Sequence, residues 1–184
     1  MFKKSKGFTL IELLIVVAII GILAALLIPN AMTAMQKAKQ KGTMKDMISI
    51  ATATVDYATD RGNLPVQSGA LSASSLLVQG IAPFYIKVCP VKDLWGNAYQ
   101  VWTGNDVAGK RSIPATEVGT DDFLFISYGR DGVAGGGDAA QWAYNPTDPT
   151  AGLYTITGMA SFKNDLINWN GSWVCAPRTA SSGT

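Results

Sequence analysis

The sequence predicts an α+β protein, with one long N-terminal helix packed on a small antiparallel β-sheet. Three observations support this. Residues 8–28 are apolar except for Thr9 and Glu12. A helical spacing of apolar residues then continues to residue 58, and turn-rich, strand-like segments fill the remainder.

Composition narrows the function before any motif is considered. The 184 residues suit one compact domain plus an additional segment. The net charge of +2 comes from the N-terminus: residues 1–7 hold three of the fifteen basic residues, and the remaining 12 face 13 acidic ones. With this balance no nucleic-acid partner is predicted. The chain has no histidine, so it lacks the commonest general base and metal ligand.

The apolar segment is long enough to cross a membrane. As a helix, its 21 residues would span about 31 Å. Three interpretations compete: a signal peptide cleaved near residues 31–34, an uncleaved anchor, and cleavage between Gly7 and Phe8. The length of the segment and its glutamate argue against the signal peptide.

The stretch GFTLIEL at residues 7–13 resembles the prepilin cleavage motif of type IV pilins and type II secretion pseudopilins. Pro29 also lies where that family places a helix-bending proline, and the similarity covers about 30 residues. The resemblance implies that prepilin peptidase removes a leader of residues 1–7 and that Phe8 becomes the N-methylated first residue. It also implies that residues 8–29 form the transmembrane and filament-core half of the helix.

Residues 30–62 are expected to form the amphipathic half of the same helix. One face carries the apolar residues Met44, Met47, Ile48, Ala51, Val55 and Ala58. Gly42 is expected to loosen this half, and Gly62 followed by Pro65 to end it.

Residues 63–184 are expected to form a β-rich globular domain. The segment 63–83 is expected to be a connecting loop with a short helix near 74–78. Strands are predicted at residues 84–88, 98–103, 123–128, 153–157 and 173–174.

Glu12 is the most informative single residue. A carboxylate inside an apolar helix is expensive and usually marks function, although so near the end of the helix it could also extend to the membrane interface. The resemblance implies that it pairs with the α-amino group of Phe8 in a neighbouring subunit.

Two motifs follow in the C-terminal domain. DLWGNAY at residues 93–99 resembles a turn of major pseudopilins, and Trp95 and Tyr99 are expected to fill the core. The glycine-rich stretch from residue 127 to 138 resembles the calcium loop of the same proteins, but Ala139 stands where they often have a second acid. Its expected Ca²⁺ ligands are Asp131, Asp138, the Tyr128 carbonyl and the Ser127 hydroxyl; the alternative is an empty, mobile loop.

Cys89 and Cys175 are expected to form a disulfide if the domain is exported. Closing a loop of about 86 residues would contribute roughly 4–5 kcal/mol. The alternative is a pair of free, buried thiols. Residues 170–172 form a glycosylation sequon at Asn170.

These patterns predict a structural subunit that polymerises into a type IV pilus-like filament, either a type II secretion pseudopilus or a surface pilus. The alternative is a membrane-anchored periplasmic enzyme or binding domain that does not polymerise and uses Ser127, Asp131 or Asp138. The expected partners are other copies of the chain, prepilin peptidase, an inner-membrane assembly platform and the lipid bilayer. The expected location is the inner membrane, crossed once with the N-terminus in the cytoplasm, and then a periplasmic or cell-surface filament. The lysines from 37 to 45 are interpreted as a solvated helix face near lipid headgroups.

Overall fold

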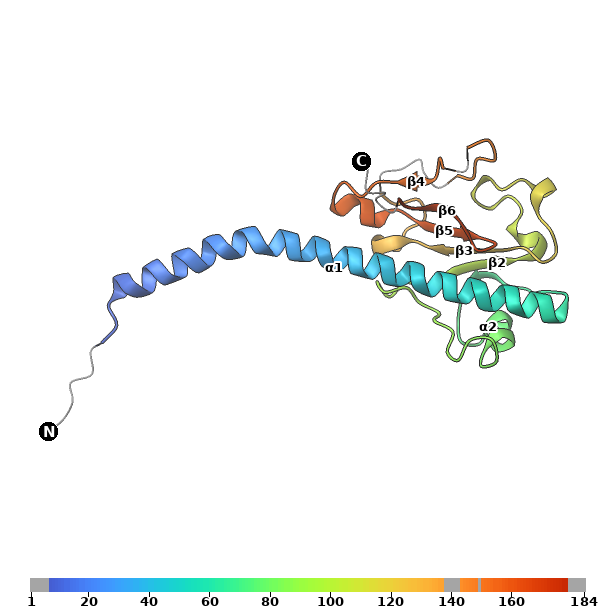
Figure 1. Ribbon diagram of the computed structural model, residues 1–184, viewed down its shortest axis with the longest axis horizontal. Helices are drawn as coiled ribbons and strands as arrows, with labels where there is room; N and C mark the ends of the chain where they lie inside the picture. The colour runs from blue at the N-terminus through green and yellow to red at the C-terminus, as the bar shows by residue number, and fades with distance from the viewer. Residues whose placement is uncertain (1–6, 138–142, 149, 179–184) are drawn as a thin grey trace, which may run out of the picture. The chain divides into compact units, whose positions relative to one another are not determined.

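The computed structural model describes residues 7–137, 143–148 and 150–178 (Figure 1). Its contacts divide the chain into two units, Met1–Gln36 and Lys37–Thr184. Helix α1, Leu10–Arg61, begins in the first unit and ends in the second. The predicted long helix is therefore confirmed.

Helix α1 continues through Pro29 and Gly42. After Pro29, the Asn30 amide donates to the Leu26 carbonyl at 3.3 Å, and the Thr33 hydroxyl donates to the Pro29 carbonyl at 3.0 Å. These two bonds stabilise the turns on either side of Pro29, whose ring nitrogen carries no N–H. Gly42 has a role other than the predicted loosening, because a Cβ there would lie 2.2 Å from Leu94 Cδ1. The glycine allows the turn at Leu94 to approach the helix closely.

The helix ends at Gly62, as predicted. Gly62 has a φ of 72°, and its N–H donates to the Ala58 carbonyl at 2.8 Å. A glycine in the left-handed region that bonds back to the last turn is a common helix C-terminus.

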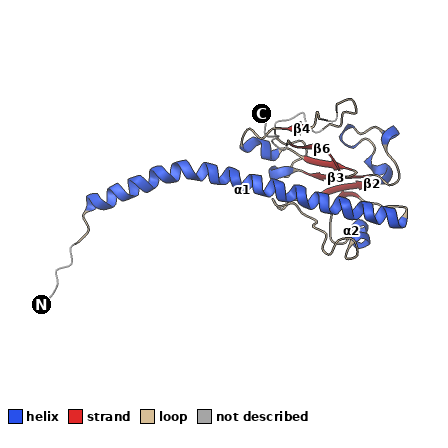
Figure 2. Cartoon of the chain, viewed as in Figure 1, coloured by secondary structure: helices blue, strands red, loops and turns tan. Residues whose placement is uncertain are grey.

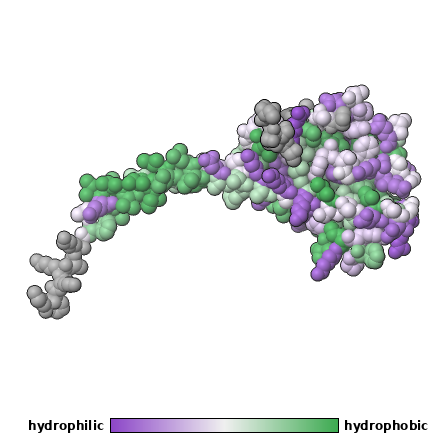
Figure 3. Space-filling view, in the orientation of Figure 1, coloured by the Kyte–Doolittle hydropathy of each residue, from purple (hydrophilic) through white to green (hydrophobic). Residues whose placement is uncertain are grey.

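The first half of α1 is apolar on all sides. Figure 3 shows a nearly unbroken hydrophobic surface along the visible face of this half. Its most apolar 18-residue window has a mean hydropathy of 3.1, and none of that window is buried. Length and composition therefore allow this segment to cross a membrane.

The second unit contains a six-stranded sheet and one further α-helix, α2 (Leu76–Ile81). The strands are β1 (Ser68–Ala70), β2 (Gln100–Thr103), β3 (Phe123–Ser127), β4 (Leu153–Tyr154), β5 (Leu166–Trp169) and β6 (Ser172–Pro177). Short 3₁₀ helices lie at Gly104–Val107, Lys110–Ser112, Ala115–Glu117, Gly129–Asp131 and Met159–Lys163. The spatial order of the strands is β1-β2-β3-β5-β6-β4.

Two apolar clusters lie on opposite faces of this sheet, because side chains alternate along a strand. The first cluster joins Met47 and Ile50 of α1 to Val101 and Phe125 of the sheet. Figure 2 shows the second half of α1 running along the sheet. The second lies behind the sheet and includes Leu124, Ile126 and Ile167. At the sheet edge, the Gln40 amide donates to the Tyr154 hydroxyl at 2.8 Å, so α1 is also bonded to β4.

The second unit differs from the prediction in several of its strands and in the position of its short helix. Residues 84–88 form no strand, because the amides of Tyr85 and Ile86 donate to the Ile81 carbonyl and turn the chain back on α2. Phe84 is left 83% exposed. The predicted strand at 153–157 is confined to β4, which pairs with β6 in parallel, so the sheet is mixed rather than purely antiparallel. No strand was predicted at β1 or β5, and the short helix expected near 74–78 lies at Leu76–Ile81.

The predicted disulfide is wrong for this fold. Cys89 and Cys175 are both free and buried. Cys89 belongs to the cluster on the α1 side of the sheet, and Cys175 belongs to the cluster behind it. The sheet therefore separates the two thiols, and each packs as a small apolar side chain.

The thiol arrangement makes a direct prediction. Burial raises the pKa of Cys89 to about 11 and that of Cys175 to about 12, so very little reactive thiolate forms at neutral pH in the folded protein. We expect slow alkylation of the native protein by iodoacetamide. After unfolding without a reductant, mass spectrometry should find both cysteines alkylated. An unfolded chain that takes up no label until a reductant is added would contradict the fold.

Candidate functional site

The start of α1 is held by a capping box, a reciprocal pair of contacts at a helix N-terminus. Glu12 Oε2 accepts hydrogen bonds from the Thr9 backbone N–H at 2.9 Å and from the Thr9 hydroxyl at 2.8 Å. The Glu12 N–H donates back to the Thr9 hydroxyl at 3.3 Å. Thr9-Leu10-Ile11-Glu12 matches the sequence pattern for a capping box, but no such contact was predicted.

The remaining Glu12 oxygen, Oε1, makes no hydrogen bond to any residue that the structure describes. The carboxylate therefore keeps one oxygen available while it caps its own helix. Large apolar side chains surround it on the helix surface, and all of them are exposed in the isolated chain: Phe8, Leu10, Ile11, Leu13, Leu14, Ile15 and Val16.

The predicted cleavage junction lies just before the helix. Gly7 and Phe8 are exposed and outside any helix or strand, and α1 begins at Leu10. The space around Gly7 is open, because a Cβ added there would have no atom within 4 Å. The rest of the predicted leader, residues 1–6, lies outside the described residues.

Asp93 is the centre of the second site, the DLWGNAY turn. Its Oδ1 accepts from the backbone N–H groups of Trp95 at 3.0 Å and Asn97 at 2.8 Å. Its Oδ2 accepts from the Ser127 hydroxyl at 2.8 Å. One buried carboxylate thus fixes the turn and joins it to the end of β3.

The turn also contacts α1 and the glycine loop. The Leu94 N–H donates to the Thr43 hydroxyl of α1 at 3.2 Å, and the Asn97 amide donates to the Gly129 carbonyl at 2.8 Å. Tyr99 is fully buried in the apolar cluster between α1 and the sheet, and Trp95 packs against that cluster. The predicted structural role of Trp95 and Tyr99 is therefore confirmed.

The glycine loop runs between two carboxylates. The Gly135 N–H donates to Asp165 Oδ2 at 2.9 Å. A Cβ on the next residue, Gly136, would lie 2.4 Å from Asp131 Oδ2. Consecutive loop residues therefore touch Asp165, which immediately precedes β5, and Asp131 at the end of the preceding 3₁₀ helix.

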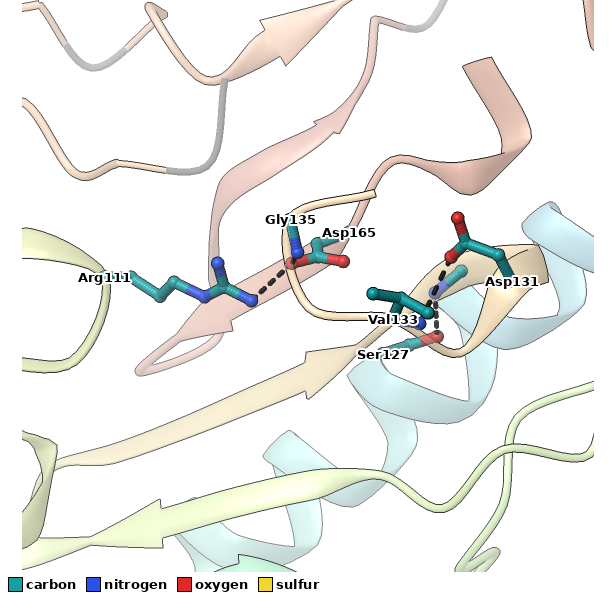
Figure 4. A network of polar contacts seen from close by, with 7 residues as sticks. Arg111, Ser127, Asp131, Val133, Gly135 and Asp165 are labelled. Atoms are coloured by element: carbon teal, nitrogen blue, oxygen red, sulfur yellow. Dashed lines mark hydrogen bonds and ion pairs between the residues drawn. The ribbon is translucent and has the colours of Figure 1, made fainter. Parts of the chain in front are cut away.

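Asp165 is the residue of this loop that sequence reasoning missed. It is 2% exposed, and its Oδ1 is buried without a partner among the described residues. In Figure 4 this oxygen points to the side on which Asp131 lies. Burial raises the pKa of Asp165, as does the nearby Asp131 charge, while the Gly135 N–H and Arg111 lower it. Asp165 lies far along the sequence from the loop, so sequence spacing gave no signal for it.

Of the four predicted calcium ligands, the three that the structure describes lie in different surroundings. Asp131 lies in the loop, where Oδ1 accepts from the Val133 N–H at 3.2 Å. The Ser127 hydroxyl is buried, donates to Asp93 and accepts from the Gly129 N–H, and its role as a ligand stays a prediction. Tyr128 is half-buried at the loop entrance. Asp138 lies outside the described residues.

The Asn170 side chain is engaged in the folded domain. Its Oδ1 accepts from the Phe123 N–H at 2.9 Å, and its Nδ2 donates to Asp122 Oδ1 at 2.7 Å. Asn170 is exposed at the surface, and these two bonds hold its amide against the start of β3.

A long helix with an apolar first half, packed through its second half on a small sheet, defines the pilin and pseudopilin class. The comparisons agree with this class. Residues 2–28 match the prokaryotic N-terminal methylation motif. No solved structure gives a significant match.

Curated relatives identify the family within the class. The type II secretion system core protein G of Vibrio cholerae is 33% identical over 147 residues, which cover 76% of this chain and 93% of that protein. The proteins of the same name from Aeromonas hydrophila and Pseudomonas aeruginosa are 35% and 34% identical, over 92% and 91% of their lengths. The chain belongs to the family of type II secretion system core protein G, the major pseudopilins.

Proposed function

We propose that this chain is the repeating subunit of a type II secretion pseudopilus. The observation that carries the proposal is the apolar half of α1, which has no cover in the isolated chain. Exposed apolar surface of this extent requires lipid or other copies of the same helix around it. In a filament subunit, the lipid bilayer covers this surface before assembly, and the helices of other subunits cover it in the filament core.

The family supports a secretion pseudopilus over a surface pilus. The relatives are named for type II secretion. The turn at residues 93–99 and the glycine-rich loop, which resemble those of major pseudopilins, support the same choice. The anchored-enzyme alternative depended on Ser127, Asp131 or Asp138. The Ser127 hydroxyl is fully buried, so a substrate has no access to it as a nucleophile.

The proposed life of the subunit has two stages. The new chain would enter the inner membrane with its basic leader on the cytoplasmic side and its folded domain on the other. Prepilin peptidase would then cut after Gly7, and an assembly platform in the same membrane would extract the subunit into the filament. This order explains why the junction before Phe8 is non-helical and exposed.

Glu12 is proposed to act between subunits. An α-amino group with a pKa near 8 is mostly charged at neutral pH, and burying it without a partner is costly. Cleavage creates this group on Phe8, and the filament core would bury it. Glu12 Oε1 is available to accept it while Oε2 keeps its bonds to Thr9.

Two matched substitutions separate the charge of Glu12 from its capping role. A glutamine side chain can still complete a capping box, so Glu12→Gln should preserve the helix start and remove only the charge. Thr9→Val should remove the cap and keep the charge. We expect Glu12→Gln, like Glu12→Leu, to lower the yield of sheared filaments about ten-fold or more, while membrane insertion and cleavage continue.

The Thr9→Val filaments should form at near wild-type yield in the same assay. If Thr9→Val loses filaments and Glu12→Gln keeps them, Glu12 serves only to cap its own helix, and the intersubunit proposal is wrong.

Processing can be measured directly. We expect the intact mass of the subunit in filaments to correspond to a chain that begins at Phe8 and carries an N-methyl group. The matched control is Gly7→Asp, which places a bulky charge at the junction and should accumulate the uncleaved form in the membrane. Filaments whose subunits retain residues 3–7 would contradict the proposed cleavage.

We also propose that the glycine loop binds Ca²⁺ through Asp131 and Asp165. Ca²⁺ prefers carboxylate and carbonyl oxygens, and the unpartnered Asp165 Oδ1 is a buried anion directed toward the Asp131 side of the loop. Backbone carbonyls such as that of Tyr128 would add ligands. The described residues hold no cluster of three acidic, cysteine or histidine side chains. The ion would therefore depend on the backbone for much of its coordination.

Calcium binding predicts a change in thermal stability. For the full chain in an uncharged detergent, Ca²⁺ should raise the melting temperature above that in EGTA, by about 2–4 °C for each kcal/mol of binding free energy. Asp131→Asn and Asp165→Asn should each abolish the difference, and Asp106→Asn, at an exposed position outside the loop, should keep it. Identical wild-type melting in Ca²⁺ and EGTA would leave the loop without a metal.

A further inference from the structure

The Asp165 carboxylate already has one cation beside it. The Arg111 guanidinium bonds to Asp165 Oδ2, the same oxygen that accepts from the Gly135 N–H (Figure 4). The Arg111 side chain is 12% exposed, and the Asp165 side chain is fully buried. The guanidinium also lies over the Tyr128 ring, 5.8 Å from its centroid. This is a largely buried ion pair beside the glycine loop.

The backbone at Arg111 is held in an unfavourable conformation. Arg111 has φ 50° and ψ 38°, and Ser112 follows with a φ of 64°, so two consecutive residues other than glycine lie in the left-handed region. The Arg111 carbonyl accepts from the Tyr144 N–H at 2.9 Å, which holds this turn in place. Such strain persists only where surrounding contacts fix it, and here it accompanies the ion pair.

The charges set up a competition. Asp131 and Asp165 contribute two negative charges near the loop, and Arg111 contributes one positive charge that is bonded to Asp165. A cation on Asp165 Oδ1 would share one carboxylate with the guanidinium. Like charges that share a partner weaken each other's binding, and burial strengthens the effect because the screening is poor.

We propose that Arg111 competes with the metal for Asp165. Its guanidinium holds the glycine loop in place without Ca²⁺ and weakens the binding of a cation at Asp165. The inference rests on the proposed calcium site. Arg111 would be a positioning residue for the loop and would set the calcium concentration at which the loop responds. A purely structural ion pair, with no influence on cation binding, is the competing explanation.

Terbium luminescence can test the competition. Tb³⁺ occupies calcium sites and is sensitised by nearby tyrosine and tryptophan, so it reports binding directly, and Ca²⁺ is then titrated against it. The sample is the full chain in an uncharged detergent. Arg111→Gln keeps an N–H donor near Asp165 and removes the charge, and Arg111→Met removes both. The matched control is Lys110→Met, which removes an equal charge from the neighbouring residue, whose ammonium lies over the Trp102 ring rather than at Asp165.

We expect Arg111→Gln and Arg111→Met to bind Ca²⁺ about ten-fold tighter than the wild type, while Lys110→Met and Arg111→Lys remain within about two-fold of it. In EGTA the two neutral variants should melt below the wild type, and saturating Ca²⁺ should recover most of the loss. If Arg111→Met is too unstable to measure in EGTA, the Arg111→Gln titration decides the question.

The outcomes separate the two proposals. If the wild type binds Ca²⁺ and the neutral Arg111 variants bind it equally or more weakly, the competition is wrong and the calcium site stands. If neither the wild type nor any Arg111 variant binds Tb³⁺ or Ca²⁺, both the calcium site and the competition are overturned.

Discussion

Helix α1 must satisfy two different environments along one unbroken backbone. Its first half carries apolar side chains on every side and has no cover in the isolated chain, whereas its second half buries only the face from Gln40 to Thr54 that packs on the sheet. A helix that is apolar all round is stable in lipid or among similar helices. The need to cover this half explains the membrane stage, the filament stage and the placement of a single carboxylate, Glu12, near its start.

The second unit is organised by buried carboxylates. Asp93 fixes its own turn, bonds to Ser127 on β3, and positions Leu94 beside Thr43 and Gly42 of α1. Asp165 ties the start of β5 to the glycine loop and to Arg111. A buried carboxylate that lost its donors would be costly, so these two residues couple the loop and turn to the sheet. The sheet and α1 are joined by the apolar cluster around Met47 and Phe125.

Local sequence patterns predicted the main elements of the fold. They did not predict contacts between residues that lie far apart in the sequence. Apolar spacing and Gly62 predicted the helix and its end, and short runs rich in apolar and aromatic residues predicted β2 and β3, because these signals lie within one segment. The strand β1 has the sequence Ser-Gly-Ala, which has no strand propensity of its own, and forms by pairing with β2. Asp165 and the separation of Cys89 from Cys175 depend on which face of the sheet each residue occupies. The capping box of Thr9 and Glu12 was readable from the sequence and was overlooked.

The central claim is that the apolar half of α1 becomes the filament core, with Glu12 opposite the amine of another subunit. Electron cryomicroscopy of filaments assembled from this chain measures that relation directly. The account predicts that the helices pack together from Phe8 onward. It also predicts that the Phe8 nitrogen of one subunit lies within about 4 Å of a Glu12 oxygen of its neighbour. A core in which the Glu12 carboxylate contacts only its own Thr9, with the neighbouring amine elsewhere, would contradict it.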